Sequence, residues 1–165
     1  MSQWSLKERL QPSLLDRITD EHPEKTRESA DQALLGQQDL KRAVIRDLGW
    51  LLNAINLEVV QDLEDYPEVS RSVLNYGVPE LCGHSASTVD LPRLEKAVRE
   101  AILQFEPRII RNSLSVRVTT DQDAMAHNAL SFEIQGAIFG QPAPFQIMLR
   151  SQLDLENGEF GVHEV

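Results

Sequence analysis

The sequence is poor in cysteine, in aromatic residues and in long apolar runs. Its single cysteine, Cys82, cannot form an internal disulfide, which agrees with a reducing compartment. No stretch of about 20 apolar residues is present to span a membrane. The first ten residues mix Lys7, Glu8 and Arg9 with isolated apolar residues and so lack the apolar region of a signal peptide. We therefore expect a cytoplasmic protein.

Basic residues are also scarce relative to acidic ones. The 165 residues include 16 Lys and Arg against 26 Asp and Glu, a formal net charge of −10. Such a charge repels phosphate backbones and anionic lipid surfaces, so we expect no nucleic-acid partner and no membrane insertion. A chain of this length can bury a core that needs neither a disulfide nor a metal for stability.

The sequence signatures of several enzyme classes are missing. There is no phosphate-cradling glycine loop, no Gly-x-Ser-x-Gly elbow and no dinucleotide fingerprint. The four histidines are scattered, and Cys82 with His84 supplies two of the four ligands that a structural zinc site needs. Cys82 would act as a nucleophile only beside a base, and a buried inert thiol is the commoner case. We predict no catalytic residue, no metal and no cofactor.

The N-terminal part, residues 1–37, is predicted to be an arm ahead of one folded domain at residues 38–165. Leu14, Leu15 and Ile18 form a short apolar patch behind Ser13, a possible helix N-cap, and a polar run follows. A helix this short is not stable alone in water. It therefore docks either onto its own domain or onto another protein, and both alternatives stay open at this point.

Three later segments have helical patterns. Apolar residues recur at helical spacing from Asp39 to Ile55, and Gly49 inside this helix suggests a close packing contact. A short helix is expected from Pro67 through Leu74, ended by Gly77. The acidic stretch before it, residues 58–68, is interpreted as a solvated loop.

The third helix is the best delimited. Asp90 is a good N-cap with Pro92 in the first turn, and the apolar period continues to Phe105. The helix must stop near Phe105 because the residue before Pro107 is pushed out of the helical region.

Beyond Pro107 the apolar period falls to two, which is typical of half-buried strands. We expect strands over residues 113–119, 130–138 and 145–155, and a short last strand at Phe160 and Val162 after the Asn157-Gly158 turn. The loops between them suit an antiparallel meander. The fold class is therefore α+β, with N-terminal helices packed on one face of a C-terminal antiparallel sheet of about three to four strands.

The most informative local motif is Glu106-Pro107-Arg108, at the joint between the last helix and the first strand. Because the proline ring fixes φ, the two charged residues are held in a defined relation. Arg108 can offer a planar, bidentate donor fork to a carboxylate on this chain or on another. The alternative is a helix stop with two solvated charges.

Four segments together resemble the TssE family of type VI secretion baseplate subunits, which is similar to the lysozyme-like baseplate-wedge proteins of contractile phage tails. They occur in the same order over nearly the whole chain. The segments are Ser-Leu-Leu-Asp-Arg-Ile at 13–18, Arg-Asp-Leu-Gly-Trp-Leu-Leu-Asn at 46–53, Tyr-Pro-Glu-Val-Ser-Arg-Ser-Val-Leu-Asn-Tyr-Gly at 66–77 and the Glu-Pro-Arg motif. The chain departs from the family at Gly49, where glutamate is expected, and at Ala54-Ile55, where Thr-Arg is usual.

The resemblance implies an α+β domain at the base of a contractile sheath, in contact with other wedge subunits and the first sheath layer. It implies partner binding at Glu106, Pro107 and Arg108, and we add the patch of Leu14, Leu15 and Ile18. An exposed sheet edge would pair with a sheath strand, a contact that places few demands on side chains.

Two other functions compete with this assembly role. One is a peptidoglycan glycosidase with two carboxylates, for instance Glu106 and an acidic residue of 58–68. The other is an anti-adaptor that blocks a protease-targeting factor; those proteins share mainly the Glu-Pro-Arg motif. No muramidase constellation is readable in the sequence, so a structural role is favoured over both.

Overall fold

A computed structural model describes residues 13–19, 36–80, 89–119, 129–140 and 143–164. Cys82, His84 and the loop expected at 120–127 lie outside the described residues, as does most of the polar part of the arm.

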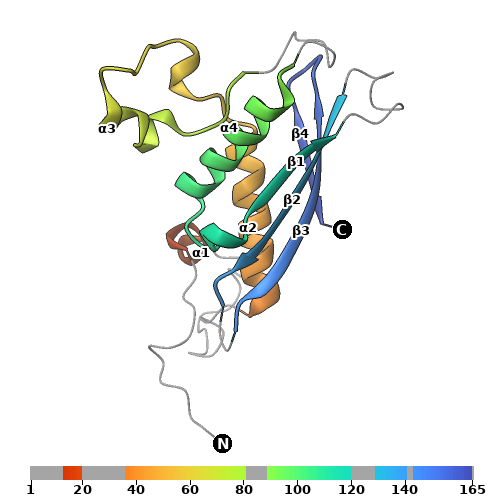
Figure 1. The fold of residues 1–165 in the computed structure, drawn as a ribbon. Helices are drawn as coiled ribbons and strands as arrows, with labels where there is room; N and C mark the ends of the chain where they lie inside the picture. The colour runs from red at the N-terminus through yellow and green to blue at the C-terminus, as the bar shows by residue number, and fades with distance from the viewer. Residues whose placement is uncertain (1–12, 20–35, 81–88, 120–128, 141–142, 165) are drawn as a thin grey trace, which may run out of the picture.

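The C-terminal half is a four-stranded antiparallel sheet in the order β1-β2-β3-β4 (Figure 1). The strands are Ser115–Thr119, Ala129–Ile138, Phe145–Asp154 and Phe160–Glu164. Their alternating sequence sets the register because one face must be buried. Ile134 of β2 thus lies between Val116 of β1 and Leu149 of β3, and all three are buried. The meander predicted from the sequence is confirmed.

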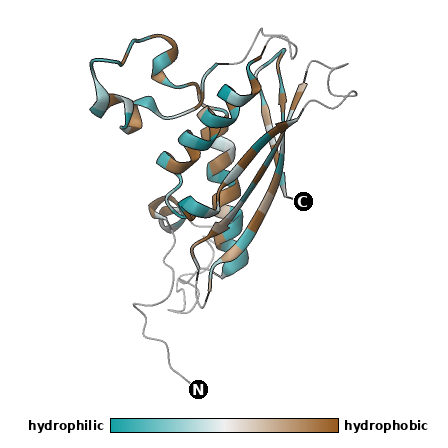
Figure 2. Ribbon diagram, viewed as in Figure 1, coloured by the Kyte–Doolittle hydropathy of each residue, from teal (hydrophilic) through white to brown (hydrophobic). Residues whose placement is uncertain are grey.

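Two long helices, α2 (Gln37–Leu52) and α4 (Leu91–Phe105), cover the inner face of the sheet (Figure 1). Their apolar stripes face the strands and their polar residues face outward (Figure 2). The core joins both layers through fully buried side chains that include Leu48, Leu52, Val98, Ile102, Phe132 and Leu149. The expected α+β class, with helices on one face of the sheet, is confirmed.

Helix α4 has the bounds and the cap expected from the sequence. The Asp90 side chain accepts a hydrogen bond from the Arg93 N–H, and the helix ends at Phe105, two residues before Pro107. Helix α2 is shorter than expected, because it ends at Leu52. The N–H groups of both the backbone and the side chain of Asn53 donate to the Gly49 carbonyl and close the last turn. Ile55 then leaves the helix and forms an isolated parallel bridge with Val78.

The prediction of a close packing contact at Gly49 is wrong. In the part of the chain that the structure describes, no atom other than those of the adjacent residues and of the nearby backbone of the same helix lies within 4 Å of the position that a Cβ would occupy there. Gly77 is the constrained glycine: its φ is +129°, and an added Cβ would lie 2.3 Å from the Ala54 carbonyl oxygen. Glycine is required at position 77 because the end of the 53–80 segment passes close to the backbone at the start of the same segment.

We call the segment between α2 and α4, residues 53–80, the excursion. It contains η2 (Leu57–Val59), α3 (Pro67–Ser70) and η3 (Val73–Asn75), and it stands off the helix layer (Figure 1). The prediction of a single helix from Pro67 through Leu74, ended by Gly77, is wrong. Ser72 is extended, and its hydroxyl accepts from the Leu74 N–H, so it ends one turn and caps the next. The acidic residues of 58–68 are exposed, as expected of a solvated loop.

The two glycines should respond oppositely to alanine. Gly49→Ala should raise the free energy of unfolding by about 0.5–1 kcal/mol, because the helix interior loses its glycine and the methyl group meets no neighbour. Gly77→Ala should lower it by more than about 1 kcal/mol, because φ is positive and the backbone is close. Urea denaturation of both variants measures the difference; a destabilising Gly49→Ala would contradict the open space there.

Candidate functional site

The Glu-Pro-Arg joint lies where α4 meets the sheet, and its backbone is fixed on both sides. The Glu106 N–H donates to the Ile102 carbonyl and continues the helix, while the Arg108 carbonyl accepts from the Phe139 N–H at the end of β2. Ile109 forms an isolated antiparallel bridge with Ile138. Backbone hydrogen bonds therefore hold the joint to both α4 and β2. Pro107, in the middle of the joint, is exposed.

The donor fork of Arg108 is occupied by carboxylates of this chain. Its Nε donates to Glu106 Oε1 at 2.7 Å, and its Nη2 donates to Glu106 Oε2 and, at 2.5 Å, to Asp47 Oδ2. The Arg108 backbone N–H also donates to Glu106 Oε1 at 3.1 Å. Of the two alternatives that the sequence left open, the structure thus shows the bidentate contact within the chain.

The environment explains why these charges are paired. Glu106 is only 3% exposed, and a buried carboxylate without a cation would be strongly destabilising. Burial alone would lower the pKa of Arg108, but hydrogen bonds and charge from Glu106, with smaller contributions from Asp47, raise it. Burial, Asp47 and Glu106 together raise the pKa of the neighbouring Tyr76 phenol. The arginine therefore stays charged at every physiological pH.

The ion pairs continue from the joint to the N-terminal helix α1 (Leu14–Ile18). Asp47 also accepts from Arg46, whose Nη1 donates to Asp16 Oδ1 at 2.5 Å. The Arg46 guanidinium lies 4.9 Å from the ring centroid of Trp50, a cation–π distance. Charged groups thus connect α1, α2 and the joint in one network, which we call the charge network: Asp16, Arg46, Asp47, Glu106 and Arg108.

Helix α1 docks onto its own domain by its polar side. Partial burial opposes ionisation of Asp16, yet hydrogen bonds from Arg46 and Ser13 hold its pKa below the ordinary value. The resulting stabilisation is present above the ordinary carboxyl pKa and is lost as the pH falls through the lowered one. The apolar side chains of Leu14 and Ile18 remain largely exposed, and Leu15 is half exposed.

A hollow of about 450 Å³ adjoins the charge network between α1, α2 and the joint. Its apolar wall includes Leu15, Trp50 and Phe105, and its polar floor is formed by Arg46, Asp47, Glu106 and Arg108. Phe105 is held by an edge-on ring contact with Tyr76 at 5.2 Å. This arrangement suits the insertion of an apolar side chain beside a polar group. It does not suit proton transfer, because both carboxylate oxygens of Glu106 accept from Arg108.

The structure brings together residues that the sequence placed far apart. The hollow is lined by Glu106, Pro107, Arg108 and Leu15, whereas Leu14 and Ile18 do not line it and are largely exposed. Sequence reasoning gave no role to Asp16, Arg46 or Asp47. The available signal was their presence in two of the motifs that carry the family resemblance, at 13–18 and 46–53.

A scan against protein-family models matches residues 38–143, well over half of the chain, to the family described as baseplate wedge protein gp25. The chain belongs to this family. Searches of curated proteins and of solved structures found no match. The gp25 family is structural, and its members interact with other proteins of a phage-tail-like baseplate. In the parts of the chain that the structure describes, no helix is both long and apolar enough to cross a membrane.

The charge network of this gp25-family chain should dominate the stability of the joint. Arg108→Ala leaves Glu106 buried without a cation and should lower the free energy of unfolding by about 3 kcal/mol. Arg108→Lys should lower the free energy of unfolding by less than Arg108→Ala but should not reach the wild-type value, because lysine lacks the planar donor fork. Denaturant titration measures both variants.

Arg42→Ala is the matched control, because Arg42 pairs with Asp39 on the exposed side of α2. It should cost less than about 0.5 kcal/mol. Equal losses for Arg108→Ala and Arg42→Ala would show that Glu106 does not need its cation.

Proposed function

We propose that this chain is a structural baseplate subunit of a contractile type VI secretion apparatus, which assembles in the cytoplasm at the base of the membrane-docked machine. It binds the other wedge subunits through the Glu-Pro-Arg joint and α1, and it binds the first layer of the sheath through one edge of its sheet. The observation that carries this proposal is the gp25-family match over a domain whose joint is held rigid by the charge network.

The wedge-binding surface consists of the joint and the outer side of α1. Glu106 and Arg108 position the joint, and the exposed Pro107 presents it to a partner. Leu14 is 74% exposed and Ile18 71% exposed, four residues apart on a five-residue helix. Residues at this spacing share one helix face. The helix is therefore anchored by Asp16 and offers two apolar side chains to a partner helix or groove.

Aspartates at these two positions test the wedge surface. Leu14→Asp/Ile18→Asp should leave the thermal stability unchanged, because both side chains are exposed, and should weaken binding to co-expressed wedge subunits at least about 10-fold. The measurement is co-purification of the wedge, followed by titration of the isolated variant. Met148→Asp, a partly exposed residue on the opposite, uncovered sheet face, is the control. A fall in melting temperature for the α1 variant would place the patch in the core instead.

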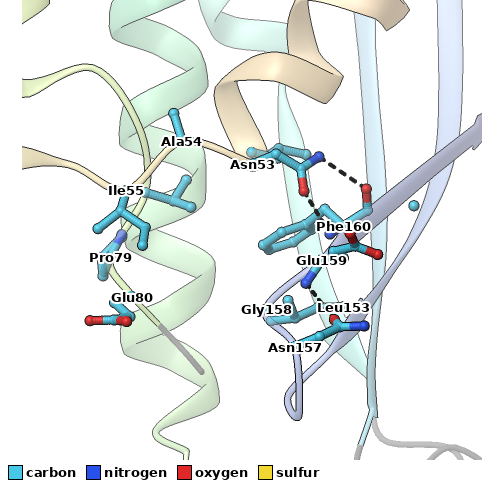
Figure 3. A pocket seen from close by; sticks show the side chains of 13 residues that line it. Asn53, Ala54, Ile55, Pro79, Glu80, Leu153, Asn157, Gly158, Glu159 and Phe160 are labelled. Carbon is cyan, nitrogen blue, oxygen red and sulfur yellow. Dashed lines mark hydrogen bonds between the residues drawn. The ribbon is translucent and has the colours of Figure 1, made fainter. Parts of the chain in front are cut away.

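The two sheet edges differ in how open they are. The β1 edge is partly covered by α4, because the Val118 N–H donates to Glu95 Oε1 at 2.8 Å and Arg99 Nε donates to the Leu114 carbonyl. On the β4 edge the side chain of Asn53 pairs with both the N–H and the C=O of Phe160, as another strand would (Figure 3).

Backbone alternation makes the rest of the β4 edge available. Because Phe160 directs its backbone groups outward, Val162 and Glu164 of this antiparallel strand also direct theirs away from β3. A hollow of about 710 Å³ lies beside the start of this edge, between Ile55 and the 157–160 turn (Figure 3). These features favour β4 as the edge that receives a sheath strand.

Prolines on the outer side of each edge test this choice. Val162→Pro removes an N–H that points outward and keeps the bonds to β3, so it should abolish sheath recruitment while the variant stays folded. Val116→Pro is the corresponding change on β1, where the same alternation from Val118 directs the N–H outward. Because the Val116 side chain is buried and that of Val162 is partly buried, circular dichroism first checks that each variant is folded. Recruitment is measured by co-sedimentation with assembled sheath. Loss of sheath recruitment with Val116→Pro alone would assign the contact to β1. Normal recruitment of both variants would reject strand addition.

A further inference from the structure

The Val-Leu-Asn-Tyr-Gly motif at 73–77 divides into three residues with internal roles and two without. Asn75 is buried; its Oδ1 accepts from the Glu58 N–H and its Nδ2 donates to the Ser70 carbonyl. Tyr76 packs edge-on against Phe105, and Gly77 provides the positive φ. In contrast, the side chain of Val73 is 79% exposed and that of Leu74 is 67% exposed.

The backbone beneath these two residues is fixed. Asn75 joins η2 to the end of α3, and the Gln104 side chain of α4 donates to the same Ser70 carbonyl at 3.2 Å. The excursion closes at its base where Val78 donates to Ala54 and accepts from Asn56. Two large apolar side chains, Val73 and Leu74, are thus exposed on a segment whose backbone is held in place by hydrogen bonds. Such exposure on a fixed support is typical of a protein contact.

The charge of the excursion indicates the chemistry of the partner. Residues 53–80 contain six carboxylates against the single guanidinium of Arg71. Five of these six carboxylates precede the turn that holds Val73 and Leu74 in the sequence, and Glu68 lies in α3 itself. A second copy of this chain would bring the same negative charge to the contact and be repelled. A segment with lysines or arginines beside apolar anchors would be attracted.

We propose that the corner between α3 and η3 is a second docking surface, at which Val73 and Leu74 receive a basic, apolar segment of another baseplate protein. The partner class makes this inference rest on the proposed function. The surface lies on the excursion and is distinct from α1 and the Glu-Pro-Arg joint. It assigns a use to the two residues of the motif that the fold does not need.

Removal of the apolar anchors tests the surface. The full chain is titrated with the purified wedge subunits, and Val73→Ser/Leu74→Ser, which removes the apolar side chains without a change of charge, should bind at least about 10-fold more weakly than wild type. Its melting temperature should not change, because neither side chain is buried. Met148→Ser is the control for the loss of an apolar side chain at an exposed position.

Charge changes on α3 test the basic character of the partner, with opposite signs expected. Glu68→Lys should weaken binding several-fold, and Arg71→Glu, three residues further on, should strengthen it. Wild-type affinity should fall as salt rises, and the fall should be smaller for Glu68→Lys.

The outcomes separate the two proposals. If wild type joins the wedge and Val73→Ser/Leu74→Ser binds equally well, the second docking surface is rejected and the proposed function stands. If wild type does not join the wedge at all, both are rejected. If wild type self-associates in sedimentation and the double variant does not, the corner is a contact between copies of this chain. If both charge variants bind like wild type, the partner is not basic.

Discussion

The pairing of Glu106 with Arg108 is the constraint around which the rest of the molecule is arranged. Glu106 is buried at the end of α4, where a carboxylate requires a cation with good geometry. Arg108 can supply it from two residues away only because Pro107 turns the chain between them. Its Nη2, which also donates to Glu106, reaches Asp47 in the C-terminal half of α2. One side chain therefore joins both helices at the point where the sheet begins.

The same interaction determines what this gp25-family chain can offer to a partner. Asp47 and Arg46 extend the network to Asp16, so that a five-residue helix is held on the domain by charge, with its apolar side outward. A helix of this length has no stability of its own. The joint, the hollow and α1 thus form a single preorganised surface. Preorganisation reduces the conformational entropy that is lost on binding.

Two asparagine side chains join parts of the chain that no regular structure connects. Asn53 pairs with Phe160 as a strand residue would, and it thereby fastens the end of α2 to the outer edge of β4. Asn75 satisfies backbone groups of both η2 and α3 and holds the excursion together. An amide carries a donor and an acceptor at once, which suits it to replace a peptide group. The excursion can therefore keep a defined shape outside the core.

The sequence by itself determined the layers, because they follow from local periods. The period of two indicated three strands, the Asn157-Gly158 turn indicated a short fourth one, and Asp90 with Pro107 delimited α4, since a cap and a proline act on adjacent backbone. The sequence also contains four motifs in the order typical of the baseplate-wedge proteins. The family match confirms this resemblance. Helix ends without such local signals were missed: Ser72 divides the helix expected from Pro67 to Gly77, and Asn53 ends α2 before Ile55.

Only the tertiary structure decided where the charges meet. Asp16 and Arg46 are 30 residues apart, and Asp47 and Arg108 are 61 apart, so no periodic pattern relates them. Which carboxylate occupies the fork of Arg108, and which side of α1 faces the domain, depends on how α2 packs beside the joint. The same holds for Gly77, which is constrained by the backbone of Ala54 and Asn56, and for Gly49, whose Cβ position meets no neighbour. Ion pairs and close approaches are non-local, and their energies appear only when burial has removed the competing water.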